Sequence, residues 1–299
     1  MLKSIFIIYI AQETSDGAGV RLKRVFGGMR SAPFTDPFLL LDNFGSTNPE
    51  EYIMGFPWHP HRGIETVTYL LDGKVEHEDS EGNRGVIYPN ELQWMTAGSG
   101  IYHQEMPRPI SREDGAAYIK VNHDAVFGFQ LWINLPSTLK MSWPAYRSIK
   151  PQNVPVIGLD NGGSAKIIAG KYKQYDGAVP FSGNSSPLYM DIMLEPWSEF
   201  RINTLQGFKT IVYPFIGQGL INGVKFEKHR AYVLSEDGEE IYVSAGEVGT
   251  RFLLFAGRPI REQIAWYGPI VMNTQEQLEQ AFADLRNGIF IKHKEPNIL

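Results

Sequence analysis

The sequence predicts an all-β protein made of two tandem antiparallel β-barrels, with one short helix near the C-terminus. Short runs of β-branched and aromatic residues alternate with turn sequences through both halves of the chain. The 299 residues include 30 glycines and 19 prolines, a composition that favours many tight turns. Helical periodicity is confined mostly to the tail. A chain of this length can form two domains, each with its own core.

The first half has a regular alternation of strands and turns. We interpret residues 1–10 as a first strand, because this apolar stretch is too short to span a bilayer. It is also shorter than the apolar region usual in a cleaved signal sequence. A well-buried strand is expected at residues 127–135, where aromatic and aliphatic residues dominate. The other strands expected in this half are residues 64–71, 75–79 and 93–96.

A proline-rich segment divides the chain. Four prolines fall within 20 residues, at positions 136, 144, 151 and 155, as is typical of a semi-rigid linker. We therefore expect a first domain at residues 1–136, a linker at 137–155 and a second domain at 156–299. The second half repeats the pattern of the first, which suggests a weak internal repeat. Its expected strands are residues 210–215, 240–243 and 251–256, with turns at 217–219 and 245–247.

One helix is expected at about residues 275–287. Thr274 followed by Gln277 has the form of a capping box. Apolar residues then recur at helical spacing, and Gly288 stands where a C-terminal cap belongs. These apolar residues are Leu278, Ala281, Phe282 and Leu285. The stripe is expected to dock the helix on a core.

Two short motifs carry most of the functional information: His59-Pro60-His61 and His103-Gln104-Glu105. Residues two apart in an extended strand project to the same face. Two such strands side by side would aim three imidazoles and one carboxylate at one point, a set that suits a transition metal with open coordination positions. Spacing alone does not choose the carboxylate. Glu65 lies four residues after His61 and shares its strand parity, so Glu65 and Glu105 both remain open.

Composition limits the classes of function. The net charge is −5 and no basic run occurs, which argues against direct binding to nucleic acid. The absence of cysteine excludes disulfides, thiolate ligands and a thiol nucleophile. It also fits a reducing compartment, so we expect a cytoplasmic protein, or a nuclear one if the source is eukaryotic. No segment is apolar enough to predict a membrane span.

The sequence around the histidines resembles the pirin family. Residues 55–69 resemble the first motif of that family, and residues 93–105 resemble its second. Supporting matches lie at residues 36–42, 128–136, 257–259 and 267–269, so the resemblance runs from about residue 20 to 290. Two features depart from the pattern. Asn90-Glu91 stands where a Gly-Asp turn is common, and the segment 111–126, which includes His123, is longer than usual.

The resemblance implies a bicupin, with two cupin barrels and a metal in the N-terminal one. It implies the ligands His59, His61, His103 and Glu105, and leaves Glu65 as a structural residue or a neighbour of the ligands. The implied metal is Fe(II), with other divalent metals as alternatives. The second half has no paired histidines, so one metal per chain is expected.

The resemblance also implies an activity. Several pirins are similar to flavonol dioxygenases, which open the central ring of quercetin with O2 and release carbon monoxide. Glu105 would be both a weak ligand and the general base. An alternative is a metal-containing regulator that binds a protein partner, such as a transcription factor or an enzyme, without turnover. A third reading is a metal-stabilised barrel without activity. All three use the same four ligands.

We expect structural roles for the remaining histidines and for the aromatic residues near the motifs. The aromatic side chains near the motifs could line a pocket for a flat ligand, but core packing is their more common role. Three histidines lie outside both the motifs and the segment 111–126, and we expect them to be structural or exposed. The aromatic residues are Phe56, Trp58 and Trp94, and the histidines are His77, His229 and His293.

Overall fold

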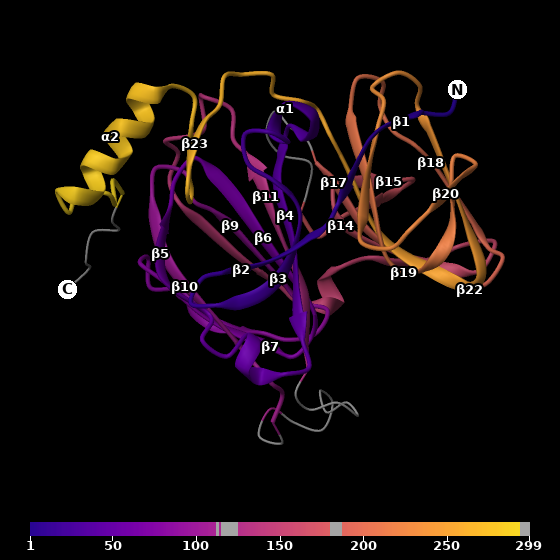
Figure 1. The fold of residues 1–299 in the computed structure, drawn as a ribbon, viewed down its shortest axis with the longest axis horizontal. Coiled ribbons are helices and arrows are strands. Elements are labelled where there is room, and N and C mark those ends of the chain that lie inside the picture. The colour runs from indigo at the N-terminus through magenta and orange to yellow at the C-terminus, as the bar shows by residue number, and fades with distance from the viewer. Residues whose placement is uncertain (112–113, 115–124, 180–186, 294–299) are drawn as a thin grey trace. The chain divides into compact units, whose positions relative to one another are not determined.

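The structure is a computed structural model that describes residues 1–111, 114, 125–179 and 187–293 (Figure 1). The chain forms two compact units, each built from segments distant in sequence. The histidine unit comprises Gln12–Arg30, Phe38–Pro151 and Arg261–Leu299. The second unit comprises Met1–Ala11, Ser31–Pro37 and Gln152–Ile260. Both units consist mostly of antiparallel β-strands, so the predicted all-β class is confirmed.

The histidine unit contains a seven-stranded and a four-stranded sheet. The larger sheet has the order β12-β9-β6-β11-β4-β3-β2, and the smaller one β5-β10-β7-β8. Buried residues of both sheets form one shared cluster, which includes Leu22, Phe44, Val75 and Ile87. The strands of the larger sheet are β2 (Gln12–Asp16), β3 (Val20–Gly27), β4 (Phe38–Ser46), β6 (Ile64–Asp72), β9 (Leu92–Thr96), β11 (Val126–Asn134) and β12 (Ala145–Ile149). Those of the smaller sheet are β5 (Phe56–His61), β7 (Lys74–Asp79), β8 (Arg84–Ile87) and β10 (Ile101–Arg108).

A C-terminal segment completes the histidine unit. It contains the hairpin of β23 (Ala265–Tyr267) and β24 (Ile270–Met272), followed by helix α2 (Gln275–Arg286). The predicted capping box is present, because Gln277 N donates to Thr274 Oγ1 at 3.2 Å and Thr274 N donates to Gln277 Oε1 at 3.2 Å. Leu278 and Ala281 pack with Ile270 and Met272. No helix in the described part of the chain is long and apolar enough to cross a membrane.

The second unit is built on a nine-stranded sheet with the central order β1-β21-β19-β22-β17-β14-β13. Its inner residues form a cluster that includes Ile192, Phe200, Tyr232 and Phe252. Its remaining described elements are the helix α1 (Ala32–Thr35) and a two-stranded hairpin. The 3-10 turn Pro151–Asn153 lies at the division between the two units, and the histidine unit has another 3-10 turn at Pro49–Glu51. The strands are β1 (Ile5–Ile10), β13 (Val156–Gly158), β14 (Gly163–Ala169), β17 (Leu188–Leu194), β18 (Glu199–Asn203), β19 (Lys209–Ile221), β20 (Val224–Phe226), β21 (Arg230–Leu234) and β22 (Glu240–Gly257), with the hairpin β15 (Lys171–Tyr172) and β16 (Tyr175–Asp176).

Two predicted turns in the second half are wrong. Residues 217–219 lie inside β19, and residues 245–247 lie inside β22, which runs for 18 residues. The glycines at 217 and 219 mark a shift in the β19–β22 register, which indicates a bulge that bends the strand without ending it. The long strand β22 pairs with β18 along its first part and with β17 along its last part.

The expected barrels are not closed by hydrogen bonds. Among the described residues, each large sheet has two end strands that do not pair with each other. The architecture is therefore one of open curved sheets, and it agrees with the predicted fold in being two antiparallel β units with a short C-terminal helix.

The compact units also differ from the continuous division at 1–136, 137–155 and 156–299. The predicted first strand pairs with β21 of the second unit, and α2 belongs to the histidine unit. Within the predicted linker, 137–155, β12 pairs with β9 of the histidine unit, and the division between the two compact units falls after Pro151. Strand pairing and the buried contacts of α2, not sequence order, decide these memberships.

Candidate metal centre

Two neighbouring antiparallel strands carry the predicted ligands. His59 and His61 lie at the end of β5, and His103 and Glu105 lie on β10. His103 is directly opposite His59, and Ile101 is opposite His61. The register then shifts, because Glu105 is opposite Phe56. The extra residue in β5 is a bulge of the kind that redirects side chains next to functional sites.

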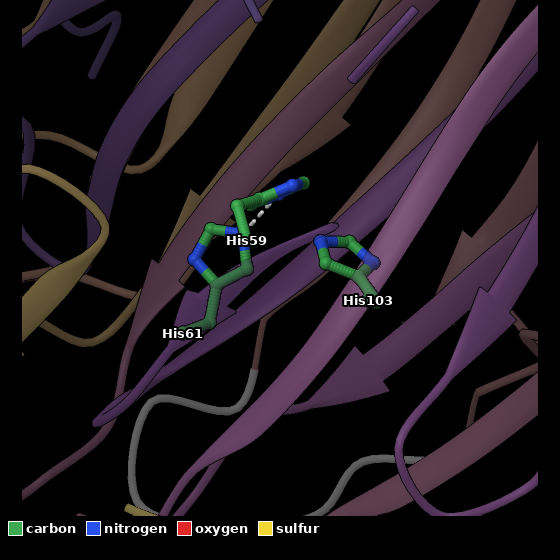
Figure 2. A group of neighbouring side chains, drawn as sticks. All are labelled: His59, His61 and His103. Atoms are coloured by element: carbon green, nitrogen blue, oxygen red, sulfur yellow. Dashed lines mark hydrogen bonds between the residues drawn. The ribbon is translucent and has the colours of Figure 1, made fainter. Parts of the chain in front are cut away.

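The structure brings the three histidines together. One ring nitrogen from each histidine lies within 4.8 Å of those from the other two. The Nε2 atoms of His59 and His61 are 3.1 Å apart, and the ring centroids of His59 and His103 are separated by 4.3 Å. Figure 2 shows the three rings converging from the two strands. This spacing is suitable for three nitrogen donors to one transition-metal ion.

Backbone carbonyls fix the orientation of two of the rings. The Nδ1 atom of His59 lies 2.8 Å from the carbonyl oxygen of Pro57, and that of His61 lies 3.1 Å from the carbonyl oxygen of Pro269. A carbonyl oxygen only accepts, so Nδ1 carries the proton in both rings and Nε2 keeps a free lone pair. Metal-ligating histidines are commonly held by such contacts.

The surroundings of His103 favour a bound cation most clearly. The ring is 1% exposed, and neither of its nitrogens has a hydrogen-bond partner among the described residues. A buried polar atom without a partner is costly, and a bound metal would satisfy one of these nitrogens. Burial lowers the pKa of His103 and of His61 well below the ordinary value, and neighbouring His59 adds to both effects. Both rings are therefore neutral at neutral pH, the form that binds metals.

Glu105 does not belong to the compact group of three. Its carboxylate is buried and accepts two short hydrogen bonds, from Thr68 Oγ1 at 2.7 Å and from Gln130 Nε2 at 2.6 Å. Burial raises its pKa, while the bond from Thr68, the charge of His59 and the bond from Gln130 oppose that rise. The side chain is thus held in place on the strand that carries His103, and its role as a fourth ligand stays a prediction.

The alternative carboxylate, Glu65, is also outside the group. It accepts a hydrogen bond from Thr96 Oγ1 at 2.7 Å, and burial raises its pKa. The shared parity with His61 assumed one continuous strand. The chain instead turns after His61, and Glu65 lies on β6 in the other sheet. The spacing argument for Glu65 is therefore wrong.

A pocket of about 670 Å³ opens onto His59 and His61. Its volume lies within the usual range for small-molecule sites. The aromatic part of its lining consists of Phe56, Trp58, Trp132, Trp266 and Tyr267. Phe56 and Trp58 thus lie on the pocket, as the sequence reading allowed. Trp94 is 4% exposed and is not part of this lining.

A charged edge faces the same pocket. Arg24 donates from Nε and Nη2 to the two carboxylate oxygens of Asp42, at 2.9 and 2.7 Å, and from Nη2 to Asp16 at 2.8 Å. Burial raises the pKa of Asp42, and the paired guanidinium opposes that rise. All three residues line the pocket. The cavity therefore combines flat aromatic walls with a polar side that can exchange hydrogen bonds with hydroxyl groups.

Several pocket residues had no role assigned from sequence. Trp132 meets the His61 ring edge to face, with centroids 5.0 Å apart. Gln130 holds Glu105, and the Pro269 carbonyl holds His61. Each lies inside a supporting motif match, at 128–136 or 267–269, which was the only signal available. The polar pair Arg24 and Asp42 could not be linked to the site by spacing.

The other histidines have structural surroundings, in agreement with their sequence readings. Buried His77 lies 2.8 Å from the Tyr146 hydroxyl, and His229 lies 3.3 Å from the Tyr213 hydroxyl. His293 stacks on Trp143 at a centroid distance of 4.2 Å. His123 and most of the segment 111–126 lie outside the described residues.

The chain matches two family models and closely similar proteins. The model described as "Pirin" matches residues 19–133, and "Pirin C-terminal cupin domain" matches residues 189–291. A Thermoplasma acidophilum protein named "putative quercetin 2,3-dioxygenase" is 44% identical over 259 residues, covering 85% of this chain and 98% of its own. Human pirin is 36% identical over 291 residues, covering 95% of this chain and 93% of its own.

A solved structure supports the same assignment. The crystal structure of quercetin 2,3-dioxygenase from Acinetobacter baumannii is 33% identical, with a TM-score of 0.86. The match covers 97% of this chain and 99% of that one. Because two family models together match most of the chain and these relatives match nearly all of it, the chain belongs to the pirin family and contains two cupin domains.

Proposed function

We propose that this protein is a metal-dependent dioxygenase that opens the central ring of a flavonol such as quercetin with O2 and releases carbon monoxide. The observation that carries the proposal is the direct opening of an aromatic pocket of about 670 Å³ onto the histidine cluster. The names of similar proteins support the same chemistry. A flat polyhydroxylated ligand suits a cavity with aromatic walls and one charged edge.

The proposed ligands are His59, His61, His103 and Glu105, with one Fe(II) per chain and other divalent metals as alternatives. Neutral His61 and His103 fit such an ion. So do the ring nitrogens of His103, which have no hydrogen-bond partner among the residues that the structure describes. When bound, the metal supplies Lewis-acid and redox chemistry. Glu105 would complete the set if its carboxylate moved from its present hydrogen bonds towards the three rings.

Glu105 is also the proposed general base. Its burial-raised pKa brings the carboxylate closer to the pKa of a phenolic hydroxyl, which favours proton transfer from the flavonol 3-hydroxyl. Thr68 and Gln130 both donate to it. These two donors keep the carboxylate aimed and stabilise its ionised form before substrate binds.

Aromatic side chains position the substrate in this proposal. Trp132 stands against His61 and has Trp266 as its neighbour at a centroid distance of 6.0 Å. The two indoles can stack on the fused rings of a flavonol and exclude water from the reacting face. Arg24 and Asp42 lie on the polar side of the pocket, where they can bond to hydroxyl groups remote from the metal.

The test is to load the purified protein with Fe(II) without oxygen, add quercetin and air, and measure carbon monoxide and quercetin loss. The proposal expects both, in metal-loaded protein only. Glu65→Gln is a matched control, because Glu65 is another enclosed carboxylate held by a threonine hydroxyl. Metal-loaded protein that consumes neither quercetin nor O2 would contradict the enzyme proposal and favour a regulator that binds a protein partner.

A further inference from the structure

The turn that follows the histidine pair is covered by a distant part of the chain. We call residues 261–291 the C-terminal arm; it contains β23, β24 and α2. Val271 N of the arm donates to the carbonyl oxygen of Arg62 at 3.0 Å. At Gly63, φ is +80° and an added Cβ would lie 1.9 Å from the carbonyl oxygen of Val271. The arm therefore lies so close to this turn that only glycine fits.

A buried ion pair fixes the arm to the turn. Arg62 and Asp284 each have side chains 2% exposed, and Arg62 Nη1 donates to Asp284 Oδ2 at 2.7 Å. Arg62 Nη2 donates to the carbonyl oxygen of Phe290 at 2.6 Å, and the guanidinium lies 4.2 Å from the centre of the Phe290 ring. Removing one partner of such a pair would leave an uncompensated charge in the interior.

A second buried cation makes the same connection. Lys140 is 1% exposed and its Nζ donates to the carbonyl oxygens of Gly63, at 2.8 Å, and of Val271, at 2.9 Å. It also donates to Asn134 Oδ1 at 2.7 Å. One ammonium group thus bridges the turn and the arm. Two independent cations are therefore buried at the same junction, beside the pair of candidate ligands.

The arm in turn holds one of the candidate ligands. The carbonyl oxygen of Pro269 lies two residues before Val271 and accepts from Nδ1 of His61. This contact directs the other nitrogen, Nε2, towards His59. A change in the position of the arm would therefore rotate or release the His61 ring, although α2 itself contains no candidate ligand.

We propose that the C-terminal arm is a positioning element of the metal centre, and that Arg62 and Asp284 are positioning residues that act through Pro269 on His61. The inference rests on the proposed metal site. It adds that the site also requires contacts outside the four ligands. Metal affinity becomes dependent on an ion pair whose partners are 222 residues apart in sequence. Contacts that orient ligating histidines commonly change metal affinity by about 10- to 100-fold when removed.

The test uses the full-length chain with two variants. Asp284→Asn preserves the shape of the side chain. Arg62→Lys preserves the charge but replaces the two-nitrogen fork of the guanidinium with a single ammonium nitrogen. Each protein is titrated with Co(II), read by visible absorption and by competition with a chelator. We expect about 10- to 100-fold weaker binding and an altered absorption spectrum. Lys292→Met is the matched control, because Lys292 also contacts Asp284, at 2.9 Å, but is partly exposed and bonds to no residue of the turn. It should change affinity by no more than about fivefold.

Folding and binding are read separately. Circular dichroism and thermal unfolding without metal show whether each variant is folded. If Arg62→Lys is unfolded, the Co(II) affinity of Asp284→Asn alone tests the inference. Variants that lose thermal stability but bind Co(II) as the wild type does would overturn the inference and leave the pair with a purely structural role. A wild type that binds no Co(II), Fe(II) or Ni(II) would instead contradict the proposed metal site.

Discussion

Replacing Glu105 with glutamine should remove the proposed general base while keeping the structure around the side chain. Glutamine has the same shape, and its amide can be accommodated in the bonding arrangement around the carboxylate. The amide oxygen can accept from Gln130 Nε2, now 2.6 Å from a carboxylate oxygen, while the amide nitrogen donates to the Thr68 hydroxyl, now at 2.7 Å. Each neighbour can therefore keep a hydrogen bond to residue 105, because a hydroxyl can either donate or accept.

The two consequences of this change differ in size. Exchanging charge-assisted hydrogen bonds for neutral ones should cost stability by about 1 kcal/mol. Losing the general base should lower turnover by about 100-fold or more, which corresponds to at least about 2.7 kcal/mol of barrier. Glu105→Gln should therefore unfold at nearly the wild-type urea concentration, while carbon monoxide release from quercetin collapses.

The assay compares metal-loaded proteins at equal metal content, so that weakened metal binding is not mistaken for lost catalysis. Quercetin loss is followed by absorbance and carbon monoxide by gas analysis, with Glu65→Gln beside it. Full turnover by Glu105→Gln would refute the base assignment. Equal losses in Glu65→Gln and Glu105→Gln would show that the loss reflects general disruption of hydrogen-bonded carboxylates in this unit.

Three further predictions concern the pocket, the metal and pH. Trp132→Leu should weaken flavonol binding by about 0.5–1.5 kcal/mol beyond the loss of buried area, measured by fluorescence titration; unchanged affinity would remove Trp132 from the binding surface. Metal at 100 times its Kd should stabilise the wild type by about 2.7 kcal/mol, and a thermal shift that persists in His103→Ala would be inconsistent with the site. Although burial alone would raise it, hydrogen bonds from Arg62 and Lys292 hold the pKa of Asp284 at about 2, below its ordinary 3.8. The stability that the ionised Asp284 gives is complete above pH 4 and is lost as pH falls through about 2. The difference in unfolding free energy between wild type and Asp284→Asn should therefore be constant from pH 7 to 5 and become smaller below pH 4. A difference that grows below pH 4 would contradict the lowered pKa of Asp284.

Local patterns were sufficient to predict the strands and the histidine cluster. The apolar and aromatic runs at residues 64–71 and 127–135 became β6 and β11, because alternation and turn residues act over a few positions. The i, i+2 spacing in the two histidine motifs predicts that their side chains meet, and the pairing of β5 with β10 brings the three histidines together. The choice between Glu65 and Glu105 depended on the family resemblance, since spacing alone could not resolve it.

Long-range pairing explains what the sequence could not predict. The turn after His61 sends the chain into a different sheet, which invalidated the parity argument for Glu65. The helix at Gln275–Arg286 was predicted from its cap and apolar stripe, but its buried Asp284 has a partner 222 residues away that no local pattern reveals. The compact units differ from the predicted continuous domains for the same reason. Residues 1–11 and the helix each join the unit with which they share hydrogen bonds or buried contacts.

The proposed metal centre requires His59, His61 and His103 to bind one metal ion per chain together. The decisive measurement is elemental analysis of the purified protein after Fe(II) loading and removal of loosely bound metal. We expect about one equivalent of iron in the wild type and a large loss in His103→Ala. Two tightly bound equivalents, or undiminished metal in His103→Ala, would contradict it.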